Sequence, residues 1–105
     1  MTDEFWLRYL RAHSRRATRV LHYFGSTLAI LVLARARRPR DLLGVPLAGY
    51  VPAWFAHFFI ERNRPETFTH PLASLLADYR MLALAMTGRL GPHLARAQSA
   101  TISEE

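Results

Sequence analysis

The sequence contains neither cysteine nor lysine. Without cysteine it has no disulfide framework and no thiolate ligand, so a metal site would need nitrogen and oxygen donors. Without lysine, all fourteen basic side chains are arginines, and the formal net charge is +6. This balance suits a nucleic acid, an anionic bilayer surface or an acidic small molecule. Because the arginines flank apolar stretches and form no long basic tract, we expect lipid head groups and carboxylates as partners, and no nucleic acid.

Charge is also missing from two long stretches of the chain. Leu42 to Ile60 covers 19 positions without Asp, Glu, Lys or Arg, and Val20 to Ala34 covers another 15. A membrane-spanning helix needs about 17–25 residues, and the shorter stretch reaches this length if arginines at its ends extend to the head groups. We therefore favour a membrane hairpin over a hairpin buried in a soluble protein. Residues 1–19 contain no apolar signal-peptide core, so we expect no signal peptide.

Helical periodicity predicts an all-α fold. The fold class is a helical membrane hairpin of two apolar helices, with an N-terminal amphipathic helix and a C-terminal packed helix. The predicted helices are Asp3–His13, a second from a cap at Ser14 to about Ala36, a third over about Leu42–Arg62, and a fourth from Pro71 to a stop at Gly88. Residues 1–91 form a single helical domain in this prediction, and residues 92–105 form a polar tail that we expect to be disordered.

Prolines and charges refine this outline. Pro39 ends the second helix, and Pro52 is expected to kink the third and to free the carbonyl of Ala48. Asp78 and Arg80 argue against a third membrane span in the fourth helix. We expect its leucine-rich face to pack on the hairpin or to lie at the membrane interface.

Four of the five histidines are predicted to meet at one end of the hairpin. His22 lies 17 positions before Pro39 and His57 lies 18 after it, so both sit roughly 25 Å from the turn on antiparallel neighbours. His13 and His70 are attached to that same end. Glu61 follows His57 by four residues, which a helix places on the same face. His93 belongs to the tail and is not expected at this pole.

Imidazoles with a carboxylate and no sulfur suit iron(II), zinc, manganese or nickel. Two histidines and one carboxylate with open positions are typical of non-haem iron oxygenases. The candidate metal-binding residues are His13, His22, His57, Glu61 and His70. The alternative is that the histidines only tie helices together by hydrogen bonds.

Two arginines near this pole are candidates for binding a substrate carboxylate. Arg19 shares a helical stripe with His22, and Arg64 is held in the loop by Pro65. Arg15 and Arg62 are expected to reach lipid head groups instead.

Two segments of the sequence resemble a known family. They are FWLRYLRAHSRRATRVLHYFGSTLA and GYVPAWFAHFFIERNRPETFTHPLASLLADYRM, and the likeness covers about Phe5 to Leu90. Together they are similar to a small membrane-protein family whose fungal member is an iron(II)-dependent dioxygenase of 2-hydroxy fatty acids. The family pattern corresponds to Tyr9 through His13 (one residue wider here), to Leu21-His22, and to Ala56-His57 through Glu61, Arg64 and Pro65. The fungal enzyme is longer, and His70 is typical of the short bacterial-type members.

The resemblance implies a reaction, a cofactor and a location. The expected reaction is the oxidative removal of one carbon from a 2-hydroxy fatty acid, with iron(II) as cofactor and O2 as co-substrate. The expected location is a membrane, the bacterial inner membrane, and arginine counts place the histidine pole on the cytoplasmic side. The alternative functions are a non-enzymatic small membrane protein with structural histidines and a soluble four-helix module that binds a partner helix.

Overall fold

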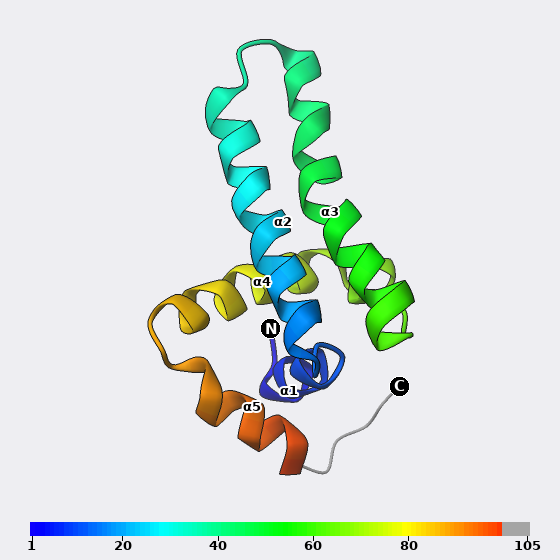
Figure 1. Ribbon diagram of the computed structural model, residues 1–105, viewed down its shortest axis with the longest axis vertical. Coiled ribbons are helices and arrows are strands. Elements are labelled where there is room, and N and C mark those ends of the chain that lie inside the picture. Colours follow the sequence, from blue (N-terminus) through cyan, green and yellow to red (C-terminus); the bar gives the residue numbers. More distant parts are fainter. Residues whose placement is uncertain (100–105) are drawn as a thin grey trace.

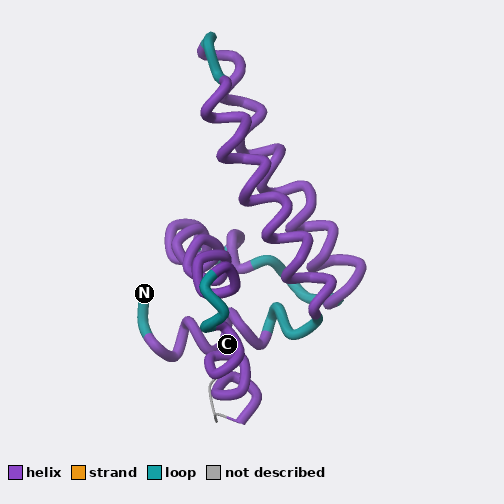
Figure 2. The backbone as a smooth tube through the Cα atoms, turned by 60° about the vertical axis from the view of Figure 1, so that its left-hand side comes forward, coloured by secondary structure: helices purple, strands orange, loops and turns teal. Residues whose placement is uncertain are grey.

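A computed structural model describes residues 1–99, and within this range the chain is helical with no strand. Figure 1 shows a long helical hairpin, α2 and α3, projecting from a wider base built by α1, α4 and α5. In Figure 1, α4 runs across the lower part of the hairpin, and in the turned view of Figure 2 the helix at this height is seen almost end-on beside the hairpin. The predicted all-α hairpin with flanking helices is confirmed.

The base begins with α1, Asp3–Arg11, which Thr2 caps through a 3.0 Å bond from the Phe5 amide to its hydroxyl. α1 is the most buried helix: Trp6 and Leu10 are fully inaccessible to solvent. They pack against α4, Pro71–Met86, and α5, Leu90–Ser99. The amphipathic N-terminal helix therefore forms the core of the base.

The hairpin consists of α2, Arg16–Arg35, and a continuous run of three helical types. This run begins as a 3₁₀ turn, η1 (Pro39–Leu43), continues as α3 (Gly44–Phe55) and ends as a π-helix, η2 (Ala56–Glu61). The two arms pack closely at Gly25, where an added Cβ would lie 2.8 Å from the Gly49 carbonyl and 3.2 Å from that of Ala48. The carbonyl that Pro52 frees thus faces the backbone of α2.

One expectation for the C-terminal part was wrong. Residues 92–99, expected as part of a disordered tail, lie in α5, because Leu90 and Ala97 are buried against the base. Residues 100–105 of that tail lie outside the described range. In α4 the buried face carries Ser74, Ala77 and Met81, whereas the leucine-rich face is exposed, as expected for the interfacial alternative. A short 3₁₀ turn, η3 (Glu66–Phe68), interrupts the loop between η2 and α4.

Candidate metal centre

Three histidines meet where the hairpin joins the base. The rings of His13 and His22 have centroids 4.3 Å apart, those of His13 and His57 are 4.5 Å apart, and those of His22 and His57 are 5.1 Å apart. One ring nitrogen of each lies within 4.8 Å of the other two. All three side chains are buried, with exposed fractions of 0%, 4% and 2%.

Each histidine comes from a different segment. His13 follows the end of α1, His22 lies nearly two turns inside α2, and His57 is the second residue of the π-helix η2. A π-helix is rare and often marks a functional site, because its wider turn changes where side chains point. Arg62 closes it in the left-handed conformation (φ 59°), and the Asn63 amide donates back to the His57 carbonyl at 2.9 Å.

The Nδ1 atoms of all three rings already have partners. His13 Nδ1 lies 2.6 Å from the Tyr9 carbonyl, and His57 Nδ1 lies 2.7 Å from Oδ1 of Asn63. His22 Nδ1 lies 3.3 Å from Oδ1 of Asp78. Because a carbonyl and a carboxylate only accept hydrogen bonds, these partners place the proton on Nδ1. The remaining nitrogen, Nε2, then carries a lone pair.

The Nε2 atoms of His13 and His22 are buried and have no hydrogen-bond partner in the protein. A buried polar atom without a partner is costly, so such a group needs an explanation. The pKa of His13 is held well below its ordinary value, first by burial and then by the neighbouring His22 and His57. A neutral imidazole is the form that binds a metal. These atoms fit a transition metal ion.

Asp78 supports the group from α4. Its carboxylate contacts His22 Nδ1 and also accepts a hydrogen bond from the Tyr9 hydroxyl. A carboxylate behind a histidine that binds metal fixes the ring and raises its basicity. The sequence analysis used Asp78 only to exclude a third membrane span. A single acidic residue in an otherwise apolar helix was the signal that could have indicated its role at the centre.

An apolar cavity adjoins the group on the hairpin side. It has a volume of about 180 Å³ and lies between α2, α3 and α4. His22 and Asp78 line its inner end. The centre therefore has a neighbouring space for an apolar group.

Residues 1–90 match the family described as 2-hydroxy-palmitic acid dioxygenase Mpo1-like. The chain belongs to this family. Comparisons with curated proteins and with solved structures found no match. The family description suggests a dioxygenase of a 2-hydroxy fatty acid, and a dioxygenase is in keeping with a three-histidine group that could hold a metal.

In this Mpo1-like chain Glu61 lies apart from the histidine group. Its carboxylate accepts hydrogen bonds from the Arg15 amide at 2.7 Å and from the hydroxyls of Ser14 and Thr18 at 3.0 and 2.7 Å. It thus caps the start of α2, where free amide groups attract an anion. The sequence predicted Glu61 as a candidate ligand beside His57, whereas both of its carboxylate oxygens accept hydrogen bonds from the start of α2, and it lies outside the group of ring nitrogens.

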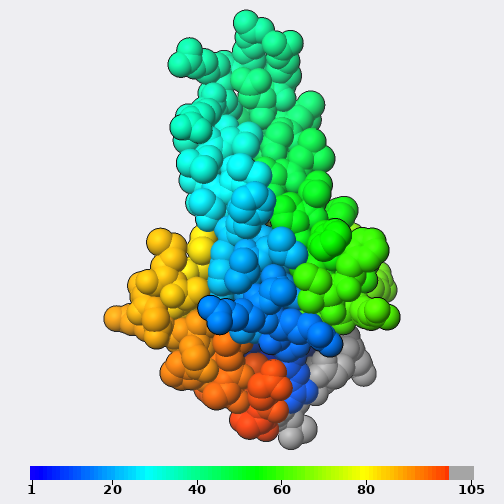
Figure 3. All heavy atoms as spheres, in the orientation of Figure 1, coloured from blue at the N-terminus to red at the C-terminus, as the bar shows by residue number. Residues whose placement is uncertain are grey.

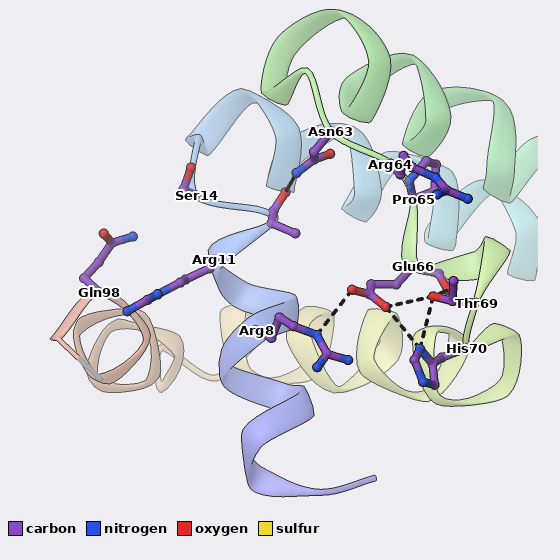
Figure 4. Close-up of a pocket in the computed structure, with 11 residues that line it drawn as sticks. Arg8, Arg11, Ser14, Asn63, Arg64, Pro65, Glu66, Thr69, His70 and Gln98 are labelled. Atoms are coloured by element: carbon purple, nitrogen blue, oxygen red, sulfur yellow. Dashed lines mark hydrogen bonds and ion pairs between the residues drawn. The ribbon is translucent and has the colours of Figure 1, made fainter. Parts of the chain in front are cut away.

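His70 and Arg64 line a separate hollow. Figure 4 shows this polar pocket, about 700 Å³, between α1, α5 and the loop before α4. His70 is half-exposed and lies 3.3 Å from the Glu66 carboxylate, which also pairs with Arg8 at 3.6 Å. The Arg64 guanidinium lies over the Phe68 ring. The structure therefore does not bring His70 to the other three histidines.

Two further polar side chains bind the backbone beside the centre, and one of them, Asn63, also lines the pocket. Asn63 lines the pocket and donates from Nδ2 to the Ala12 carbonyl at 3.0 Å, which leaves its Oδ1 for His57. Arg19 donates to the carbonyls of His13 and Ser14 at 2.9 and 2.7 Å. Sequence reasoning placed Asn63 in a loop and assigned it no role. Asn63 and Arg19 both hold the chain around His13.

Proposed function

We propose that this Mpo1-like protein is an iron(II)-dependent dioxygenase that shortens 2-hydroxy fatty acids by one carbon, with O2 as co-substrate. The observation that carries the proposal is the convergence of three buried imidazoles, each of which brings one ring nitrogen within 4.8 Å of the others and has its Nδ1 atom engaged by a protein partner. The family description supports the reaction class. The proposed ligands are His13, His22 and His57.

The donor set supports a divalent first-row metal. Three neutral imidazoles suit iron, zinc, nickel or copper, and the centre holds no sulfur ligand because the chain has no cysteine. When bound, iron(II) would supply the redox chemistry with O2 that side chains lack. The proposed three-histidine set differs from the two-histidine, one-carboxylate pattern, because Glu61 caps α2.

The protein would position the three histidine rings and shield the centre from water. Tyr9, Asn63 and Asp78 hold the three rings in one tautomer, so each Nε2 can donate a lone pair. Burial of the rings keeps water away from the centre. Arg64, in the polar pocket beside Asn63, and Arg19, beside His13, are the proposed partners of the substrate carboxylate.

We place the hairpin in a membrane, and propose the bacterial inner membrane. Both hairpin helices are long and apolar enough to span, and only 28% and 17% of their apolar windows are buried, whereas a core helix of a soluble protein is mostly buried. The α2 helix has 20 residues and is therefore about 30 Å long, with an arginine at each end, Arg16 and Arg35. His22, six residues from Arg16, would then lie about 9 Å below the head groups.

The test is a comparison of histidine variants. His22→Ala and His57→Ala should each abolish stoichiometric iron binding and turnover while helical content stays intact. The double variant should be no worse than either, because ligands of one metal act as a unit. Iron content after anaerobic loading and circular dichroism measure both effects. Full iron binding in both single variants would refute the shared centre.

Matched controls separate the three-histidine set from the wider one. His70→Ala and Glu61→Gln should still bind iron. Loss of iron in either variant would show that the residue is a metal ligand. Asp78→Asn should weaken iron affinity by about 10–100-fold without abolishing it. Arg19→Gln and Arg64→Gln should keep the iron and raise KM for the 2-hydroxy acid. An unchanged KM in both would rule out these arginines as carboxylate partners.

The rival function is a membrane protein whose histidines are structural. In that case His22→Ala and His57→Ala should lose about 1–3 kcal/mol of stability through an unpaired buried partner, and the wild-type protein should bind no metal. The unpartnered Nε2 atoms of His13 and His22 favour the metal, because a structural histidine would use both nitrogens.

A further inference from the structure

The apolar cavity beside His22 has the form of a slot that runs along the hairpin. On α2 its wall contains His22, Ser26 and Ala29, which lie on one face over seven residues, or about 10 Å. On α3 its wall runs from Tyr50 back toward the turn at Val45. The slot therefore starts at the metal centre and points away from the base.

Its two ends differ in chemistry. His22 and Asp78 make the inner end polar, and both belong to the centre described above. The Tyr79 hydroxyl donates to the Ser26 carbonyl at 3.3 Å, so this polar pair is satisfied within the wall. The outer end is formed by apolar side chains, among them Ala29 and Val45. A ligand that fits has one polar end and one apolar end.

Small residues create the space. A Cβ added to Gly49 would lie 3.7 Å from the Cβ of Ala29, an ordinary contact, so a side chain at position 49 could extend into the slot without displacing backbone. Gly25 is different, because its added Cβ would clash with the Gly49 carbonyl. Gly25 therefore serves the packing of the two arms, whereas Gly49 leaves room for a ligand.

The slot opens toward the proposed lipid side. Pro46 is exposed, and Leu75 on α4 is 42% exposed, although both line the cavity. If the hairpin spans the membrane, this opening lies among acyl chains and not in water. An alkyl chain could pass from the bilayer into the slot without crossing an aqueous layer.

We propose that this slot binds the head-proximal part of an unbranched acyl chain, whose polar head lies at His22, and that the rest of the chain stays in the bilayer. A methylene is about as large as a water molecule, roughly 30 Å³, so a slot of about 180 Å³ holds about six methylenes. The protein then selects for a straight chain near the head and is indifferent to total length beyond that point. This inference rests on the proposed function.

Photo-crosslinking in lipid nanodiscs tests the slot. The probes are 2-hydroxyhexadecanoic acids with a diazirine at carbon 6 or at carbon 15. The carbon-6 probe should label slot residues such as Ala29 and Val45, and the carbon-15 probe should label lipid-facing residues such as Leu47 and Val51, which are 63% and 60% exposed. Equal distributions for the two probes, measured by mass spectrometry, would overturn the proposal.

Gly49→Leu fills the slot and should reduce carbon-6 labelling of Ala29 at least tenfold. Gly91→Leu is the matched control, because an added Cβ at Gly91 meets nothing within 4 Å, and it should change nothing. Undiminished labelling in folded Gly49→Leu would also refute the slot. The comparison of the two probes in the wild-type chain does not depend on this variant.

The same experiment separates the slot from the reaction, because crosslinking needs no turnover. Labelling as expected in a protein without metal-dependent activity would leave the slot standing and refute the proposed function. Turnover of the 2-hydroxy acid with no labelling of the slot would refute the slot and leave the proposed function standing.

Discussion

The base (α1, α4 and α5) and the hairpin that projects from it, here called the stem (α2, α3 and η2), are suited to different surroundings. In the base, Trp6 is fully buried, stacks on Tyr9 and donates its indole hydrogen to His93. In the stem, large apolar side chains such as Leu47 and Phe59 are more than 60% exposed. Figure 3 shows the hairpin as a narrow stem that rises from the broad base.

This difference indicates that the base and the stem are stabilised in different ways. The base buries its own apolar surface and pairs its polar groups, as a soluble domain does. The stem leaves most of its apolar surface exposed, which is the arrangement that a membrane-spanning hairpin would need. The candidate metal centre lies at the junction, where buried polar residues from the base meet the exposed apolar hairpin.

The largest expected contrast comes from deleting one aromatic ring in each region. Trp6→Ala should lose about 3–5 kcal/mol of unfolding free energy, because it empties the core of the base. Phe59→Ala, 68% exposed in the structure, should change stability in detergent by no more than about 0.5 kcal/mol. Denaturation followed by circular dichroism measures both. Similar losses would show that the stem is packed against protein and not lipid.

Alkaline pH should affect the base selectively. The pKa of Tyr9 is raised well above its usual value, mainly by burial and then by the charge of Asp78. Its stabilising contribution is complete below about pH 10, where the unfolded phenol ionises, and decreases as pH rises toward the folded pKa. We expect a loss of up to about 1.4 kcal/mol per pH unit above pH 10.

Tyr9→Phe is the control for this pH effect. It removes the ionisable group and should flatten the decline between pH 10 and 11, although it lowers stability at neutral pH through the lost bond to Asp78. An unchanged slope in the variant would assign the decline to another group.

The smallest effect on stability is expected at the tip of the stem. Seven arginines lie at the histidine end and four in the turn, and the positive-inside rule then places the histidine end in the cytoplasm. The seven are Arg8, Arg11, Arg15, Arg16, Arg19, Arg62 and Arg64. Pro39→Cys should leave stability nearly unchanged and react with a membrane-impermeant thiol reagent from the outside only. Reaction only from the cytoplasmic side would show that the orientation is the opposite of the predicted one.

Much of this architecture could be predicted because it depends on local patterns. The uncharged stretches and Pro39 define the two arms, and their equal lengths bring His22 and His57 to one level. The arrangement of Glu61 could not be predicted, since its hydrogen-bond partners Ser14, Arg15 and Thr18 lie at the start of another helix, 47, 46 and 43 residues away in the sequence. Asp78 was missed for a similar reason: its partner His22 lies on another helix, far away in the sequence.

The cap that Glu61 provides ties together the two ends of the hairpin. One carboxylate from the last turn of η2 accepts bonds from the first turn of α2. The beginning of the first arm is therefore fastened only when the second arm has returned to the base, and this return also delivers His57. Assembly of the centre is thereby coupled to completion of the hairpin: a chain whose second arm has not yet returned to the base has only two of the three histidines in place and an uncapped helix.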